Sequence, residues 1–257
     1  MIPRCLTIAG SDSGGGAGIQ ADLKAFAAAG CYGMSAIVAV TAQNTVGVTA
    51  VHEVPSELVR AQLEAVFDDL GADAAKTGML FSAPLIETVA DVLAEHPVPL
   101  VVDPVMVASS GARLLREDAV ATLVERLFPL ATVVTPNVLE AEALAGEGTQ
   151  RELAERLHEL GARAVIVTGG HAEEPLDLLF DGNDHVEISV VRYRVAATHG
   201  AGCTHSATLA ALLARGESLH AAARGAAEAA SRAVAQGLVE LGAGEGPVDV
   251  LGLRGAA

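Results

Sequence analysis

The segment Thr198–Thr204, which reads Thr-His-Gly-Ala-Gly-Cys-Thr, has residue types suited to holding an anion. It joins a strand-like region to a strongly helical run. Its glycines free the backbone to turn several N–H groups toward one point, and a helix beginning near Cys203 adds the positive end of its dipole. We therefore predict an anion hole formed by Gly200, Ala201, Gly202 and Cys203, suited to the charge on a transferring phosphoryl group.

The same position makes the Cys203 thiol a candidate reactive group. A helix N-terminus lowers the pKa of a thiol and so favours the reactive thiolate. A free cysteine is also commonly a small buried hydrophobic residue. Position alone leaves both interpretations open.

Two carboxylates, Asp103 and Glu140, are candidates for holding Mg²⁺, directly or through water. Mg²⁺ is typically bound by few carboxylates together with substrate phosphates. Each residue also has a purely structural interpretation. Asp103 can cap a turn before Pro104, and Glu140 can be a first-turn helix acid that suits the dipole. Asn137 is, by the same reasoning, an ordinary helix N-cap.

Three side chains from the first third of the chain could bind a small ring. The Gln43 amide can exchange a pair of hydrogen bonds with a heteroaromatic ring. Asp22 can hold a hydroxyl or amine, and Met79 can pack on a flat ring. Their structural alternatives are a solvated loop residue, an exposed helix acid and a core methionine. The glycine-rich run Gly10–Gly18 would let the backbone close over a ligand, or would simply be a flexible turn.

Strand-like and helix-like segments alternate, which predicts a mostly parallel sheet with helices on both faces. In such a sheet ligands bind beyond the carboxyl ends of the strands, where most of the candidate residues fall. The predicted strands are Cys5–Ala9, Met34–Thr41, Val46–Val54 (an edge strand), Ala74–Thr77, Leu100–Val102, Thr132–Thr135, Ala164–Thr168, and a hairpin of Leu176–Phe180 and Val186–Val191. The predicted helices are Ile19–Ala29, Ser56–Asp69, Ala83–Glu95, Glu117–Leu127, Val138–Ala145, Arg151–Leu160, Cys203–Ala214 and Leu219–Leu238, followed by a loose tail at Gly242–Ala257.

Composition and charge argue against several classes of protein. The 257 residues fit one α/β domain, and the net charge of −16 argues against nucleic-acid binding. Any phosphate site must therefore be local, made from backbone N–H groups and a metal. The apolar runs are too short for a signal peptide or a membrane span, which needs ~18 residues. Three cysteines without CxxC spacing indicate a reducing compartment, so we expect a cytoplasmic protein.

Several known catalytic and nucleotide-binding motifs are missing from the sequence. The pattern GxGxxG fails in every register of the Gly10–Gly18 run, and no Lys-Ser/Thr pair completes a P-loop. No His and Cys cluster has zinc-ligand spacing, and no GxSxG elbow occurs. The failed GxGxxG pattern counts against a dinucleotide-dependent oxidoreductase.

Seven segments, in order along positions 9–207, together form a recognisable set: AGSDSGGGAGIQADLK at Ala9–Lys24, VTAQNTVGV at Val40–Val48, KTGM at Lys76–Met79, VVDPVM at Val101–Met106, TPNVLEAEAL at Thr135–Leu144, TGGH at Thr168–His171 and THGAGCTHSA at Thr198–Ala207. This set resembles the hydroxymethylpyrimidine/phosphomethylpyrimidine kinases of thiamine biosynthesis, a branch of the ribokinase-like superfamily. The resemblance covers nearly the whole chain, and seven ordered matches are specific for that family.

The resemblance implies a three-layer α/β/α ribokinase-like fold with a mostly parallel central sheet, in a single domain over residues 1–257. It implies two ATP-dependent phosphorylations, first of 4-amino-5-hydroxymethyl-2-methylpyrimidine and then of its monophosphate. It also implies Mg²⁺ as cofactor, no nucleic-acid or membrane partner, and a homodimer.

The resemblance also assigns roles to single residues. Gln43 is implied to hydrogen-bond the pyrimidine, and Glu140, helped by Asp103, to organise Mg²⁺. Cys203 takes the position at which sugar-kinase relatives carry a catalytic aspartate. The residues implied to line the pyrimidine pocket are Ala17, Asp22 and Met79, and those implied to lie near ATP are Asn137, Thr168 and Gly169.

The sequence departs from the family pattern at three positions. Ala201 stands where Thr is usual, which an anion hole built from backbone should tolerate. Ser109 stands where we would expect Lys, which removes a phosphate contact and puts the second phosphorylation in question. Thr168 also replaces a frequent Lys.

Two alternatives within the fold stay open. Pyridoxal also carries a hydroxymethyl group on a ring, so a pyridoxal kinase is the nearest one. The run Thr41-Ala42-Gln43-Asn44 favours the pyrimidine instead. The second alternative is a relative that kept the fold but lost catalysis, against which the retained Cys203, Asp103 and Glu140 argue.

Overall fold

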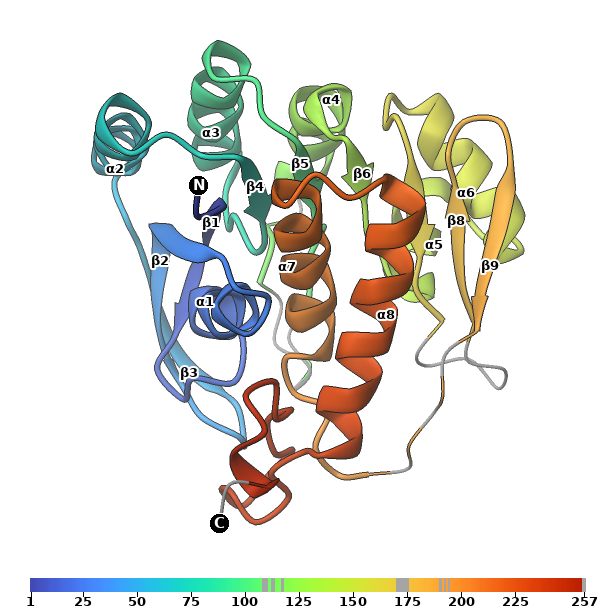
Figure 1. Ribbon diagram of the computed structural model, residues 1–257. Coiled ribbons are helices and arrows are strands. Elements are labelled where there is room, and N and C mark those ends of the chain that lie inside the picture. The colour runs from blue at the N-terminus through green and yellow to red at the C-terminus, as the bar shows by residue number, and fades with distance from the viewer. Residues whose placement is uncertain are drawn as a thin grey trace.

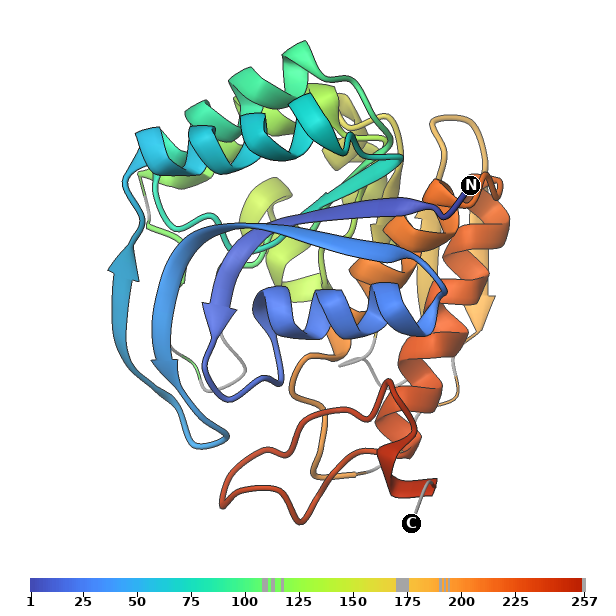
Figure 2. The same cartoon turned by 60° about the vertical axis from the view of Figure 1, so that its left-hand side comes forward.

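A twisted sheet runs through the centre of the molecule and carries helices on both faces (Figures 1 and 2). The computed structural model describes residues 1–107, 111, 114–116, 118–169, 176–189, 191, 193 and 195–255. Within these ranges the strands are β1 (Arg4–Asp12), β2 (Tyr32–Gln43), β3 (Val48–Glu53), β4 (Ala74–Thr77), β5 (Leu100–Val102), β6 (Val133–Val134), β7 (Val165–Val167), β8 (Leu176–Phe180) and β9 (His185–Ser189).

The strand order is β3-β2-β1-β4-β5-β6-β7-β8-β9. The inner strands from β2 to β7 pair in parallel. The edge strand β3 and the hairpin β8–β9 pair antiparallel, as the sequence predicted. The carboxyl ends of the six parallel strands therefore lie along one edge of the sheet, at the bottom of Figure 1.

The helices divide between the two faces of the sheet, as Figure 2 shows. One face carries α1 (Gly18–Ala28), α7 (Ala201–Ala214) and α8 (Leu219–Ala235). The other carries α2 (Ser56–Asp69), α3 (Ala83–Glu95), α4 (Ala119–Leu127), α5 (Val138–Ala145) and α6 (Gln150–Glu159). These layers confirm the predicted three-layer α/β/α fold. Among the helices of the described ranges, none is both long and apolar enough to cross a membrane.

The strand pleat explains why the inner strands read as continuous apolar runs. Successive side chains of a strand point to opposite faces, and here both faces are covered by helices. In β1, Leu6 and Ile8 pack in the core beneath α2 and α3, while Cys5 packs with Phe26 of α1 on the other side. Every position of such a strand is then buried, so apolar residues follow one another without alternation.

Two predicted boundaries were wrong in ways that matter for the site. Helix α7 begins at Ala201 and not at Cys203, because Gly200 caps it in the left-handed conformation with φ of 85°. The region Gly242–Ala257 is not a loose tail over its described part. Val248 and Asp249 are buried, and backbone hydrogen bonds hold Asp249 to Ala233. The predicted features at Ser109, Glu117, Gly170, His171 and Val190 lie outside the described residues.

Candidate functional site

The predicted site residues come from segments that follow the parallel strands. The end of β5 leads into Asp103, and its neighbours β4 and β6 bring the Lys76–Met79 and Thr135–Glu140 segments alongside. Asn137 and Thr168 form a bridge between the next pair of segments. The structure thus gathers these residues along a single edge, as expected for a doubly covered parallel sheet.

The α7 turn, defined as Thr198–Cys203, presents unused N–H groups at this edge. In the described part of the chain, the N–H groups of Gly202 and Cys203 donate no backbone hydrogen bond to a residue outside α7. They are first-turn donors of a 14-residue helix, where the dipole favours an anion. The N–H of Ala201 is different, because it donates to Thr198 O at 3.0 Å. The predicted anion hole therefore loses Ala201 as a donor and keeps Gly202 and Cys203.

Cys203 as a whole residue is partly exposed. The direction of the pKa shift of its thiol was predicted wrongly. Burial of the sulfur raises the pKa of Cys203 to about 12, and the carboxylates of Asp22 and Asp103 act in the same direction. The positive charge of Lys76 and a hydrogen bond from the backbone of Gly18 oppose this only in part. The side chain is therefore a protonated thiol near neutral pH. The expectation from the helix dipole failed because it took no account of the burial of the sulfur or of carboxylates distant in sequence.

A buried ion pair lies beneath the turn. The Lys76 ammonium donates to both Asp22 carboxylate oxygens at 2.9 and 3.0 Å, and both side chains are completely inaccessible. Thr7 Oγ1 also donates to Asp22, at 2.6 Å. Since Asp22 exposes no surface, it cannot line the substrate pocket as predicted. It holds Lys76 in place instead. Burial alone would lower the pKa of Lys76, but its acidic neighbours, Asp22 first and Asp103 after it, together outweigh burial and raise that pKa.

Asp103 extends this cluster toward Glu140. Its Oδ2 accepts a hydrogen bond from Ser206 of α7 at 2.7 Å and lies 3.9 Å from the Lys76 ammonium. Glu140 is close enough that burial and the charge of Asp103 raise its pKa to about 8. Two carboxylates that repel each other in this way form a site that a divalent cation would relieve.

Glu140 and Asn137 also form a capping box at the start of α5. Asn137 Oδ1 accepts from Glu140 N at 2.9 Å, and Glu140 Oε2 accepts from Asn137 N at 3.0 Å. The structural interpretation of Asn137 is therefore correct. Glu140 combines a structural contact with its place beside Asp103.

The pyrimidine-pocket candidates gather around the Gly10–Gly18 run, here called the glycine loop. Gln43 is tied to this loop through Ser13, which donates to Gln43 O at 2.7 Å and accepts from Gln43 N at 2.8 Å. Met79 is nearly buried, and a Cβ on Gly10 would lie only 2.4 Å from its terminal methyl group. Gly10 therefore allows the methionine to lie against the loop that carries Ala17.

The nucleotide candidates Thr168 and Gly169 are held by their backbones. Thr168 N donates to Pro136 O at 2.9 Å, and Gly169 N donates to the Asp177 carboxylate at 3.0 Å. A Cβ on Gly169 would come within 2.2 Å of Leu176 O, so this position requires glycine. Both N–H groups are already used, so any contact with ATP must come from other atoms of these residues.

Sequence reasoning missed the residues that support the site. Lys76 was quoted within a motif but given no role, although a charged residue inside a buried strand signals a buried partner. Sequence reasoning also did not connect Asp12 with His199, and the two form a buried pair with Oδ2 and Nε2 3.0 Å apart. No local pattern connects positions 12 and 199.

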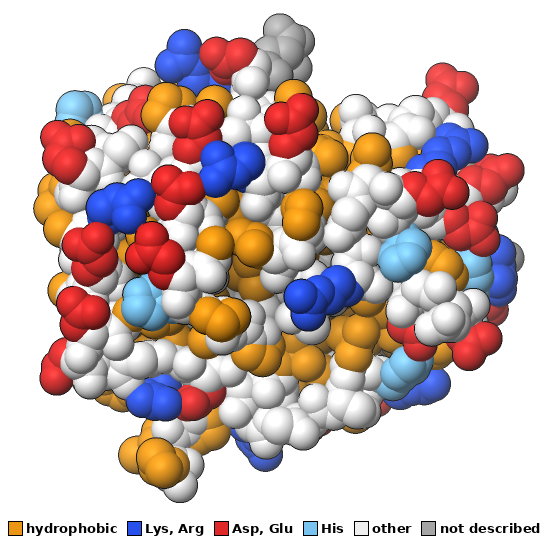
Figure 3. Space-filling view, turned by 90° about the horizontal axis from the view of Figure 1, so that it is seen from above, with side chains coloured by type: hydrophobic (Ala, Val, Ile, Leu, Met, Phe, Trp, Pro, Cys, Tyr) orange, Lys and Arg blue, Asp and Glu red, His pale blue; other side chains and the backbone are white. Residues whose placement is uncertain are grey.

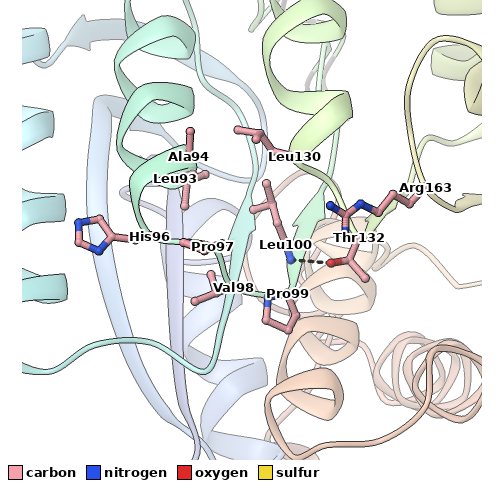
Figure 4. Close-up of a pocket in the computed structure, with 10 residues that line it drawn as sticks. All are labelled: Leu93, Ala94, His96, Pro97, Val98, Pro99, Leu100, Leu130, Thr132 and Arg163. Carbon is pink, nitrogen blue, oxygen red and sulfur yellow. Dashed lines mark hydrogen bonds between the residues drawn. The ribbon is translucent and has the colours of Figure 1, made fainter.

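A cavity of about 350 Å³ lies at the opposite end of the sheet and does not belong to this site. Figure 3 looks onto that end of the molecule, where the parallel strands begin, and Figure 4 shows the cavity. Its walls come from the end of α3, the start of β5 and the segment before β6, with Arg163 at one side. Its lining is of mixed polarity, and none of the catalytic candidates contributes to it.

Comparison with known proteins places this arrangement in a family. A family model described as phosphomethylpyrimidine kinase matches residues 12–249. The hydroxymethylpyrimidine/phosphomethylpyrimidine kinase of Rhizobium meliloti is 51% identical, over 96% of this chain and 97% of its own. A crystal structure of an ADP complex of Bacillus subtilis pyridoxal kinase superposes with a TM-score of 0.90 at 38% identity, covering 99% of each chain. Phosphomethylpyrimidine kinase of Clostridium difficile gives 0.78 at 40% identity, over 88% of this chain and 96% of its own.

The fold and the site edge therefore define a small-molecule kinase of the ribokinase-like type. This class matches the α/β/α layers and the glycine-rich turn before α7. Within the class, the chain belongs to the phosphomethylpyrimidine kinase family, as the seven sequence segments predicted.

Proposed function

We propose that this chain transfers the γ-phosphoryl group of ATP to 4-amino-5-hydroxymethyl-2-methylpyrimidine, and then a second one to the resulting monophosphate. The family match over residues 12–249 carries the proposal. The geometry adds free N–H groups of Gly202 and Cys203 and the carboxylates of Asp103 and Glu140 along the same sheet edge. ATP as donor is consistent with a Staphylococcus aureus pyridoxal kinase complex with AMP-PCP and pyridoxal, at 34% identity.

In the proposed mechanism, the hydroxymethyl oxygen attacks the γ-phosphorus in line and the bond to the β-phosphate oxygen breaks. The N–H groups of Gly202 and Cys203 stabilise the charge of the transferring group. The pyrimidine is held by Gln43, Ala17 and Met79 beside the glycine loop. The protonated Cys203 thiol orients the hydroxymethyl group and removes no proton in advance, and the hydroxyl proton passes to an oxygen of the transferred phosphoryl group as the new O–P bond forms. A loose transition state does not require early deprotonation of the nucleophile.

We propose Asp103 and Glu140 as the residues that hold Mg²⁺. The raised pKa of Glu140 beside Asp103 fits a pair of carboxylates that gains from a divalent cation. Mg²⁺ is typically bound by few carboxylates together with substrate phosphates, so two carboxylates and the phosphates of ATP would suffice. When bound, the ion would neutralise charge on the phosphate oxygens.

Release of ADP with purified protein, ATP and the pyrimidine tests the function. We expect turnover that requires both the pyrimidine and Mg²⁺, and a lower kcat/KM with pyridoxal. A higher kcat/KM with pyridoxal would support the second candidate function, a pyridoxal kinase, which the 0.90 TM-score with the Bacillus subtilis enzyme favours. Absence of turnover with either substrate would support a non-catalytic relative.

A homodimer and a cytoplasmic location also belong to this proposal, through the family resemblance. The net charge of −16 supports the absence of a nucleic-acid partner. Sedimentation equilibrium measures the oligomeric state, and a monomer at micromolar concentration would contradict the dimer.

A further inference from the structure

Two segments that are far apart in sequence meet backbone to backbone at the site. Gly200 in the α7 turn has φ of 85°, and a Cβ there would lie 1.8 Å from Gly16 O in the glycine loop. A Cβ on Gly16 would in turn lie 2.3 Å from the His199 ring. The glycine loop also lies close to Cys203, since the backbone of Gly18 acts to lower the pKa of the thiol. The relative position of these segments therefore sets where the anion hole stands against the substrate pocket.

A buried Asp–His pair joins the two segments. His199 Nε2 lies 3.0 Å from Asp12 Oδ2, and only 11% of the His199 side chain and 2% of the Asp12 side chain are exposed. Asp12 also organises the glycine loop. Its carboxylate accepts from the N–H groups of Gly14, Gly16 and Ala17 at 2.7, 3.0 and 2.8 Å. One carboxylate thus fixes the loop and, through His199, fixes the turn.

His199 is held from a third side by the C-terminal segment. Its N–H donates to Gly246 O at 3.2 Å, and its carbonyl accepts from Val248 N at 3.1 Å. Further along, Glu245 N donates to Thr45 O at 3.1 Å, two residues beyond Gln43. Figures 1 and 2 show this segment running across the end of the molecule, below α1 and the end of β2. These two hydrogen bonds therefore fix the backbone of His199, and its ring Nε2 contacts Asp12.

We propose that Asp12 and His199 are positioning residues for phosphoryl transfer. They touch no reactant. Their contact holds the N–H groups of Gly202 and Cys203 in register with the pyrimidine bound beside the glycine loop. The inference rests on the proposed role of the α7 turn. A displacement of about 1 Å between reacting groups is enough to slow an enzyme by roughly 100-fold, so a single buried contact can control turnover.

The test compares two replacements of His199 in the full-length protein. In His199→Gln the side-chain amide nitrogen can take the place of Nε2 and still donate to Asp12. In His199→Asn the shorter side chain cannot reach. We expect kcat for the pyrimidine to fall about 10- to 100-fold in the asparagine variant and to stay within about threefold of wild type in the glutamine variant. KM for ATP should change less than about threefold in both.

Two further variants make the result decisive. His52→Asn changes an exposed histidine of β3 and should leave kcat unchanged. Asp12→Asn should lower kcat at least as much as His199→Asn, because Asp12 also holds the glycine loop, and adding His199→Asn to it should cost little more, because the contact between the two side chains is already lost. Circular dichroism checks that each variant is folded at the assay temperature. If His199→Asn does not fold, Asp12→Asn alone carries the comparison with His199→Gln.

The inference is overturned if the folded asparagine variants keep kcat within about twofold of wild type. It is also overturned if His199→Gln loses as much activity as His199→Asn, or if the two asparagine losses simply multiply. These outcomes leave the proposed function intact, because wild-type turnover is measured in the same assay. Inactive wild-type protein would instead contradict the function itself.

Discussion

Replacing Lys76 by methionine should destabilise the fold strongly, because the ammonium neutralises a carboxylate that no solvent reaches. Lys76 and Asp22 are both fully inaccessible, and their two contacts measure 2.9 and 3.0 Å. Methionine has a similar length but no charge, so Lys76→Met leaves Asp22 buried with only Thr7 as a side-chain donor. Removing one member of a buried ion pair costs about 3–5 kcal/mol. We therefore expect the free energy of unfolding to fall by about that amount.

Equilibrium urea unfolding, followed by circular dichroism at pH 7, measures this change. Lys24→Met is the matched control, since Lys24 is exposed and its ammonium donates only to Gly15 O. It should change the unfolding free energy by less than about 0.5 kcal/mol. Adding Asp22→Asn to Lys76→Met should recover part of the loss, because no charge is then left unpaired. A loss below about 1 kcal/mol for Lys76→Met would refute the view that this pair is a dry, mutually dependent contact.

Three further predictions concern the site. Cys203→Ala should lower kcat by roughly 10- to 100-fold. The pH–rate profile of the wild type should nevertheless show no thiol ionisation between about pH 6 and 9, since the pKa of Cys203 is about 12. A titration near pH 7 that disappears in the alanine variant would contradict this. The free energy of unfolding should fall as pH rises from about 5 to 8, because Glu140, with a pKa of about 8, keeps its proton in the folded state and loses it in the unfolded chain. Glu140→Gln should flatten this slope. An unchanged slope would refute the assignment of the pH dependence to Glu140. Gly200→Ala should abolish most turnover, because its Cβ would lie 1.8 Å from Gly16 O. Gly47→Ala should leave turnover unchanged in the same assay, because a Cβ at Gly47 meets open space. Equal activity of the two variants would contradict the close approach of Gly200 to Gly16.

The fold could be predicted from sequence because its signals are local. Leu100–Val102 is an apolar run bounded by Pro99 and Asp103, and the strand has the predicted bounds. Helix α3 also has the predicted bounds, and Pro84 lies in its first turn, where proline is favourable. The error at the start of α7 arose from Gly200, because a left-handed cap cannot be distinguished from a loop glycine without the neighbouring loop that it contacts.

The chemistry of the site could be predicted only in part, because charges act across distances that sequence does not show. The helix N-terminus at Cys203 is a local feature, and it suggested a lowered thiol pKa. Burial of the sulfur reverses that direction, and the charges of Asp22 and Asp103, about 180 and 100 positions away, add to it. Likewise, the family resemblance implied that Asp22 lines the pyrimidine pocket. Its partner Lys76 is 54 positions away, and the pair is sealed in the interior.

The C-terminal segment illustrates the same limit. It was predicted to be a loose tail, but its glycines serve close packing. A Cβ on Gly244 would lie 2.0 Å from Thr45 O, and one on Gly246 would lie 2.4 Å from Leu238 O. In this segment glycine therefore allows a close backbone contact and does not indicate a flexible chain. A glycine that packs closely can be told from one in a flexible tail only when the positions of Thr45 and Leu238 in the fold are known.

Mass spectrometry of the reaction products gives the most direct test of the proposed chemistry. Purified protein is incubated with ATP, Mg²⁺ and 4-amino-5-hydroxymethyl-2-methylpyrimidine, and the pyrimidine is followed over time. We expect its mass to increase by one phosphoryl group and then by a second, with one ADP formed for each. Unmodified pyrimidine alongside ADP and free phosphate, or no ADP at all, would contradict the claim that the α7 turn directs phosphoryl transfer to this ring.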